Sequence, residues 1–112
     1  MVAAVGRALL TPLGPRSLAP DEPGYRGAHR GGVWERDHAY HQGTVWPWLI
    51  GPYLDAARAV GLSTDGVCDG LHAHLGEYGI GSVSETADGD PPHGATGCPF
   101  QAWSVAELLR AG

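Results

Sequence analysis

Apolar side chains recur at helical spacing in four stretches of the chain, and long polar stretches separate them. The four stretches are residues 2–10, 44–60, 63–75 and 99–111. In the second of them, one apolar stripe is formed by Trp46, Leu49, Ile50, Tyr53, Leu54, Ala57 and Val60. The pattern predicts four helices, each with an apolar face that has to pack against a neighbouring element.

The second helix, over residues 44–60, has candidate start and stop residues. Thr44 is a candidate N-cap, because its hydroxyl can accept a hydrogen bond from a free N–H of the first turn. Pro47 falls in that turn, where its missing N–H costs little. The pair Gly51-Pro52 predicts a kink, since the proline removes a donor and crowds the preceding turn. Gly61 is a suitable residue to end the helix.

Two Gly- and Pro-rich stretches, residues 11–43 and 77–97, lack a helical period, and we expect them to be irregular. A short extended piece is expected from Ile80 to Val83. Loops of this length are uncommon in small domains and are usually functional or disordered. The order of helix, loop, two helices, loop and helix suggests antiparallel helices whose long loops gather at one end.

Length, net charge and cysteine content indicate the number of domains, the partners that are disfavoured and the cellular compartment. The chain has 112 residues, which favours one domain spanning 1–112. A formal net charge of −5 disfavours nucleic acid and anionic membranes as partners. No apolar run is long enough to span a bilayer, and the N-terminus lacks the features of a signal peptide. Two cysteines, Cys68 and Cys98, form no disulfide framework, so we expect a cytoplasmic protein.

Three segments resemble the C-terminal end of glycogen debranching enzymes, in the same order along the chain. They are LLTPLGPRSLAPDEPGYRG (9–27), RDHAYHQGTVWPWLIGPYLDA (36–56) and SETADGDPPHGATGCPFQAWSVAELLR (84–110). The similar region of that family is its amylo-α-1,6-glucosidase domain. The resemblance implies an all-α fold, the last few helices of an (α/α)6 toroid with a sugar pocket at one end. It also implies an α-glucan partner, the missing N-terminal part of the barrel as a second partner, and no cofactor.

Glycoside hydrolysis needs two carboxyl groups, one as acid and one as base or nucleophile. Glu85 lies in a Gly- and Pro-rich loop, with Asp88 and Asp90 close behind it. The resemblance implies that Glu85 is the catalytic base of an inverting enzyme, which activates water for attack on the anomeric carbon. Taken without the resemblance, Glu85 is better interpreted as a solvated loop acid.

The family's partner acid lies in a motif that no stretch of this chain resembles. Asp37 is the one substitute worth weighing. We interpret it as the partner of Arg36 or Arg30, as a residue that fixes its loop, or as a contact to a sugar hydroxyl, in preference to a general acid. The isolated chain is therefore expected to be inactive.

The stretch YHQGTVWPW, residues 40–48, places aromatic and polar side chains at a junction between loop and helix. Aromatic rings can stack on the C–H faces of a sugar, while His41 and Gln42 bind hydroxyls. Trp46 fits the core and a pocket wall equally well, whereas Trp48 falls off the apolar stripe. We interpret Trp103 as a core residue. The predicted substrate-binding residues are Trp34, Asp37, Tyr40, His41, Gln42, Trp46, Trp48, Asp88, His93 and Gln101.

Three further expectations concern a non-catalytic role, metal binding and the stability of the isolated chain. The chain could be a non-catalytic remnant, or a weak carbohydrate-binding or interaction piece, instead of part of an enzyme. Cys68, His72 and His74 lie close together, but zinc sites use four ligands in recognised spacings and none occurs, so no metal is expected. Helices with uncovered apolar faces predict an isolated chain that is poorly folded or oligomeric.

Overall fold

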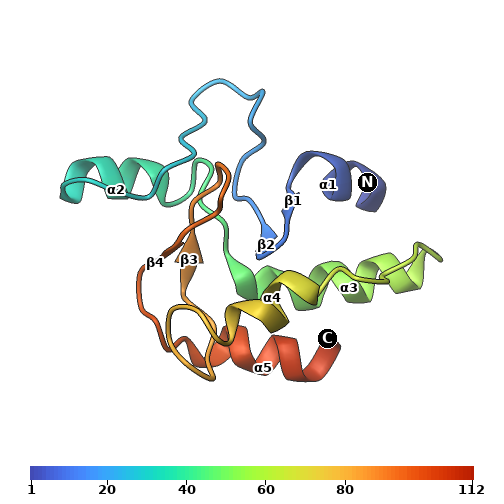
Figure 1. Cartoon of the computed structure of the whole chain (residues 1–112). Helices are drawn as coiled ribbons and strands as arrows, with labels where there is room; N and C mark the ends of the chain where they lie inside the picture. The colour runs from blue at the N-terminus through green and yellow to red at the C-terminus, as the bar shows by residue number, and fades with distance from the viewer.

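A computed structural model describes all residues from Met1 to Gly112. The chain forms five α-helices, one 3₁₀ turn and two small antiparallel sheets of two strands each (Figure 1). In chain order the elements are α1 (Val2–Ala8), β1 (Leu10–Thr11), β2 (Gly14–Pro15), α2 (Val33–Ala39), η1 (Pro47–Leu49), α3 (Ile50–Ala59), α4 (Asp69–His74), β3 (Thr86–Ala87), β4 (Ala95–Thr96) and α5 (Ala102–Ala111).

The expected all-α fold, a partial (α/α)6 toroid, is wrong. The chain forms a small mixed domain of short helices and two strand pairs around one core, with no row of helical hairpins. The physical reason lies in the Gly- and Pro-rich stretches, which do not only connect helices. Each forms a short hairpin of its own, and both pair with Val45, through Arg16 and Ala87, so that they build a small sheet-like region between the helices.

The apolar core lies where α3, α4 and α5 meet. α3 and α5 run side by side, and α4 lies against them (Figure 1). Gly70 of α4 has to be small, because a Cβ there would lie 2.3 Å from the backbone oxygen of Pro12 in the β1–β2 turn. The core consists of Leu13, Val45, Ile50, Leu54, Cys68, Leu71, Val83, Ala87, Leu108 and Ala111.

A segment of four residues, 43–46, which we call the central segment, pairs with the backbone on both of its sides. Val45 exchanges both backbone hydrogen bonds with Ala87, at 2.9 and 3.0 Å. On its other side, the N–H of Trp46 donates to the carbonyl of Pro15 at 3.1 Å. Gly43 enters the segment at a φ of 137°, and a Cβ there would lie 2.4 Å from the backbone oxygen of Arg26. This segment therefore joins the N-terminal hairpin to the β3–β4 hairpin.

The helix predicted over 44–60 begins later than expected, and Thr44 is not its N-cap. The Thr44 side chain is fully buried, and its hydroxyl donates to the carbonyl of Ala39 at 2.9 Å. Because β-branched residues favour extended backbone, the Thr-Val pair joins the central segment instead. Pro47 opens the 3₁₀ turn η1. Pro52 lies in the first turn of α3, where it removes no helical hydrogen bond, so the predicted interior kink does not arise.

Other expectations hold in part. α1 and α5 fall within their predicted ranges, and α4 is a short remainder of the helix predicted over 63–75. α2 was not predicted, because it buries only Ala39 and so shows no apolar stripe. The extended piece expected from Ile80 to Val83 is a turn, and the regular strands lie at β3 and β4. None of the helices combines the length and apolarity that crossing a bilayer would require.

Candidate functional site

Glu85 directly precedes β3, and backbone pairing fixes its place. Its N–H donates to the carbonyl of Cys98 at 2.8 Å. Its half-buried carboxylate accepts two hydrogen bonds. The Tyr40 hydroxyl donates to Oε1, and the N–H of Cys98 donates to Oε2 at 3.1 Å. These two donors hold the plane of the Glu85 carboxyl group in one orientation.

Tyr40 follows α2 and is held by packing on several sides. Its ring meets that of Trp46 edge-on at a centroid distance of 4.4 Å, and the His29 ring lies 5.2 Å away. The indole N–H of Trp46 donates to the Tyr40 carbonyl at 2.8 Å. Burial, together with the hydrogen bond to the Glu85 carboxylate, raises the pKa of Tyr40 to about 12. The phenol is therefore protonated at neutral pH and acts as a donor to Glu85.

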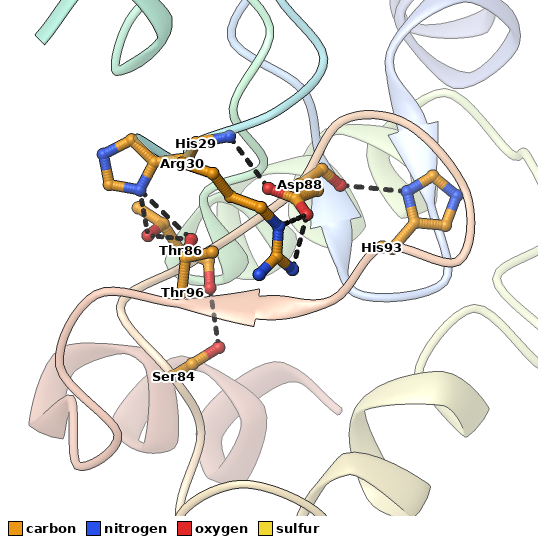
Figure 2. Close-up of polar contacts among 7 residues, drawn as sticks. All are labelled: His29, Arg30, Ser84, Thr86, Asp88, His93 and Thr96. Carbon is orange, nitrogen blue, oxygen red and sulfur yellow. Dashed lines mark hydrogen bonds and ion pairs between the residues drawn. The ribbon is translucent and has the colours of Figure 1, made fainter. Parts of the chain in front are cut away.

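Asp88 ties the loop before α2 to the β3–β4 hairpin (Figure 2). Its Oδ1 accepts the N–H of His29 at 2.8 Å, while its Oδ2 accepts Nε of Arg30 at 2.8 Å and pairs with a terminal nitrogen of Arg30 at the same distance. The carbonyl of Asp88 lies 3.0 Å from Nδ1 of His93. Asp88 is 8% exposed, so its negative charge is buried and paired.

A buried cluster of polar side chains lies beside Asp88 in the hairpin (Figure 2). The hydroxyls of Thr86 and Thr96 face each other across the strand pair at 2.8 Å, and Nδ1 of His29 lies 3.2 Å from Thr96. The Ser84 hydroxyl donates to the Thr86 carbonyl at 2.8 Å. Burial, and next the nearby Arg36, lower the pKa of His29, so its ring favours the neutral form.

An open pocket with a volume of about 470 Å³ lies next to Glu85. Glu85 sits at its edge: Tyr40 lines the pocket and donates to one carboxylate oxygen, and a Cβ on Gly97 would lie 2.6 Å from the other. We call it the hairpin pocket; its lining residues are His29, Arg30, Arg36, Asp37, Tyr40, Tyr78, Ala95, Thr96 and Gly97. Two guanidinium groups, a carboxylate and two phenols make this a polar pocket.

A second, more apolar depression of about 460 Å³ lies against η1 and α5. Trp48 and Trp103 pack on each other there, with ring centroids 5.6 Å apart and planes at 32°. His41 stacks parallel to Trp46, at 5.6 Å and 3°. We call it the aromatic groove; its lining residues are Arg16, Ser17, His41, Trp46, Trp48, Leu49 and Trp103.

The family model for amylo-alpha-1,6-glucosidase matches residues 1–110, almost the whole chain. The chain belongs to the amylo-alpha-1,6-glucosidase family. The match confirms the resemblance to the C-terminal part of glycogen debranching enzymes. It supports a function related to α-glucans at the level of the family.

In this family member, the fold divides the predicted sugar-binding residues between two places. Asp37 and Tyr40 line the hairpin pocket with Glu85 at its edge. His41, Trp46 and Trp48 line the aromatic groove instead. The aromatic stretch and Glu85 therefore do not form one cavity, although Tyr40 touches both.

The remaining predicted residues line neither place. Trp34 lies on the outer side of α2, where it is 71% exposed and its ring packs on His38 at 4.2 Å. Gln42 is exposed, and Gln101 is half-buried just before α5. Asp88 and His93 belong to the polar network under the hairpin, where Asp88 already has its hydrogen-bond partners. Their proposed contact with a sugar stays a prediction.

Several residues of the two cavities were not predicted. His29, Tyr78 and Thr96 line the hairpin pocket, and Arg16 and Trp103 line the aromatic groove. No spacing rule links positions 29, 78 and 96, because the hairpin and the central segment bring them together. The interpretation of Trp103 as a core residue is wrong, because its position only flanks the apolar stripe of α5 and its side chain is 49% exposed.

The cysteine and histidines considered for metal binding lie apart from both cavities. Cys68 is in the apolar core, and burial raises the pKa of its thiol. His74 is buried; its Nε2 accepts the N–H of Ser84 at 3.2 Å and its Nδ1 lies 3.2 Å from Glu77. No group of three or more His, Cys, Asp or Glu side chains is arranged to hold a metal ion.

Proposed function

We propose that this chain contributes the catalytic base to the hydrolysis of α-1,6-linked glucose at the branch points of an α-glucan. Glu85 is that base. The observation that carries the proposal is the pair of donors, the Tyr40 hydroxyl and the Cys98 N–H, that hold the Glu85 carboxylate at the edge of the hairpin pocket. Membership of the amylo-alpha-1,6-glucosidase family supports the substrate class.

In the proposed reaction, Glu85 accepts a proton from a water molecule as that water attacks the anomeric carbon. The bond from this carbon to the glycosidic oxygen breaks, and a general acid protonates the leaving oxygen on the opposite face of the sugar. The product is glucose of inverted configuration, and inverting enzymes hold the two carboxyl groups about 6.5–9.5 Å apart to admit the water. Each Glu85 oxygen accepts one hydrogen bond from the protein and keeps acceptor capacity for that water.

The general acid comes, in this proposal, from polypeptide outside residues 1–112. Asp37 lines the same pocket and makes no hydrogen bond or ion pair with a protein side chain, since Arg30 pairs with Asp88. We assign Asp37 to a sugar hydroxyl. Arg36 supplies further donors in the pocket.

Glucose release from a branched limit dextrin tests the proposal. We compare the chain alone, the chain mixed with the upstream polypeptide of the family's domain, and the same mixture carrying Glu85→Gln. Release is expected only from the mixture, with a loss of at least about a hundredfold in Glu85→Gln, as for general bases elsewhere. Glu22→Gln, an exposed acid remote from the pocket lining, is the matched control and should retain release.

Two results would count against this mechanism. Hydrolysis by the chain alone that survives Glu85→Gln would remove Glu85 from the chemistry. Glucose released with retained anomeric configuration, followed by proton NMR during the reaction, would exclude an inverting base.

A non-catalytic carbohydrate-binding role is the second candidate. The aromatic groove favours it, because three indole rings converge there without a carboxylate among the lining residues. Sugar binding without glucose release under any of the three conditions would favour this role over the catalytic one.

A further inference from the structure

The aromatic groove is built from segments far apart in the sequence. Trp46 and Trp48 come from the start of η1, and Trp103 comes from the first turn of α5. Trp46 is 7% exposed and forms the floor, whereas Trp103 is 49% exposed and forms a wall. An exposed indole packed on a second indole offers a wide, rigid aromatic surface at little cost in side-chain entropy.

Polar groups lie at the margin of these rings. Arg16 is anchored through Nε to the carbonyl of Gly89 at 2.8 Å, and the Ser17 hydroxyl accepts the N–H of Gly43 at 2.9 Å, which leaves its proton free to donate. His41 is exposed and stacked on Trp46. An apolar surface with a few convergent polar groups is the usual composition of a small-molecule site.

The groove and the hairpin pocket share no lining residue, yet Tyr40 connects them. Its carbonyl accepts the Trp46 indole N–H at 2.8 Å, and its hydroxyl donates to Glu85. A ligand spanning both sites would therefore contact two faces of one packed unit of Tyr40 and Trp46.

We propose that the aromatic groove is a second α-glucan subsite, which holds a linear stretch of the chain while Glu85 acts on a branch residue. Glucose units stack on Trp48 and Trp103, and their hydroxyls meet Ser17, Arg16 and His41. The ligand class rests on the proposed function, because it is the family's substrate that selects a glucan for these rings. The groove itself rests on its own geometry.

The test is a titration of the full chain with maltoheptaose, a linear oligosaccharide with no branch point, followed by the NMR signals of the four indole N–H groups. We expect the Trp48 and Trp103 signals to shift and the Trp34 signal, on α2, to stay in place. Trp103→Ala should weaken binding by about fivefold to tenfold, as loss of one aromatic stacking partner predicts.

Leu109→Ala is the matched control. Leu109 is 82% exposed on the same helix and lines neither the groove nor the hairpin pocket, so its truncation takes apolar surface from α5 without touching the groove. Trp103→Phe keeps an aromatic ring and should bind between the wild type and Trp103→Ala. These two variants separate loss of stacking from loss of folding.

Three outcomes would overturn the subsite. The first is Trp48 and Trp103 signals that stay in place when maltoheptaose is added, and the second is an affinity that Trp103→Ala leaves unchanged. The third is indole shifts that follow protein concentration without sugar, which would assign the groove to a second copy of the chain. Glu85→Gln should leave maltoheptaose binding unchanged. If Glu85→Gln loses glucose release and Trp103→Ala binds maltoheptaose like the wild type, the subsite is rejected and the proposed function is kept. If Glu85→Gln keeps glucose release and Trp103→Ala binds maltoheptaose more weakly, the proposed function is rejected and the subsite is kept.

Discussion

The two halves of this small domain are held together by different interactions. In the helical half, α3, α4 and α5 enclose side chains such as Leu54 and Leu71, each 1% exposed. In the hairpin half, the buried side chains around β3 and β4 are mainly polar, and Thr86 and Ser84 are fully enclosed (Figure 2). Apolar packing is insensitive to pH, whereas a buried polar network depends on the protonation of its members. The half that carries Glu85 is thus the half whose stability should fall in acid, through groups such as His29.

The largest effect is expected in the helical half. Leu54→Ala removes a side chain from the middle of the core and leaves a cavity, which should lower the free energy of unfolding by about 2–5 kcal/mol. Chemical denaturation followed by circular dichroism measures the loss. Val60→Ala, at an exposed position just after the same helix, should change it by less than about 0.5 kcal/mol. Equal effects of the two substitutions would mean that this core does not dominate stability.

A smaller, local effect is expected in the hairpin half. Asp88→Ala leaves the His29 N–H without its acceptor and Arg30 without its partner, at a cost of about 1–3 kcal/mol. Amide hydrogen exchange should accelerate at Thr96 and Ala87 more than at Leu54, because the hairpin loosens first. Asp65→Ala, an exposed acid with no side-chain partner, is the control. Uniform acceleration across both halves would contradict the division.

The same contrast explains which elements the sequence could predict. The stripe from Leu49 to Ala57 indicated α3 because burial on one helix face leaves a period that survives in the sequence. β3 and β4 are two residues long, so they are too short to show an alternating pattern. They exist because Val45 pairs with Ala87, which is a long-range contact.

The candidate site was predictable in part for a related reason. Glu85 was found through a family motif, and Tyr40 through its aromatic neighbourhood. Their hydrogen bond joins residues 45 positions apart, and local spacing carries no record of it. The prediction of an all-α fold was wrong for the same reason. The stretches that were expected to be irregular loops contain β3 and β4, and Ala87 of β3 pairs with Val45 over a long sequence distance.

The pH dependence of stability should also distinguish the halves. The folded-state pKa of His29 is below its usual value because of burial and of Arg36, with Asp88, Glu85 and Asp37 acting the other way. The unfolded chain then binds a proton more readily than the folded one as pH falls below about 6.5. We expect the contribution of His29 to the free energy of unfolding to be constant above that pH and to fall below it. His29→Gln should reduce the decrease in the free energy of unfolding below this pH. His72→Gln, at an exposed position, should leave that decrease unchanged.

The smallest effect on the free energy of unfolding is expected for the hydrogen bond between the Tyr40 hydroxyl and the Glu85 carboxylate. Tyr40→Phe removes the hydroxyl that donates to Glu85 and keeps the ring against Trp46, so at neutral pH it should cost about 0.5–1.5 kcal/mol. In the wild type, the Tyr40 pKa is raised to about 12. The contribution of the hydroxyl is therefore complete below the unfolded pKa of about 10 and is lost as pH rises toward 12.

Urea unfolding at pH 8 and pH 11 measures this contribution, and the stability difference between wild type and Tyr40→Phe should shrink at the higher pH. Tyr78→Phe, which removes an exposed hydroxyl that donates to the carbonyl of Gly97, is the comparison for the loss of a phenol hydroxyl at both pH values. A constant difference across this range would mean that Glu85 does not depend on the phenol for its orientation, and the proposed base would then be held by Cys98 alone.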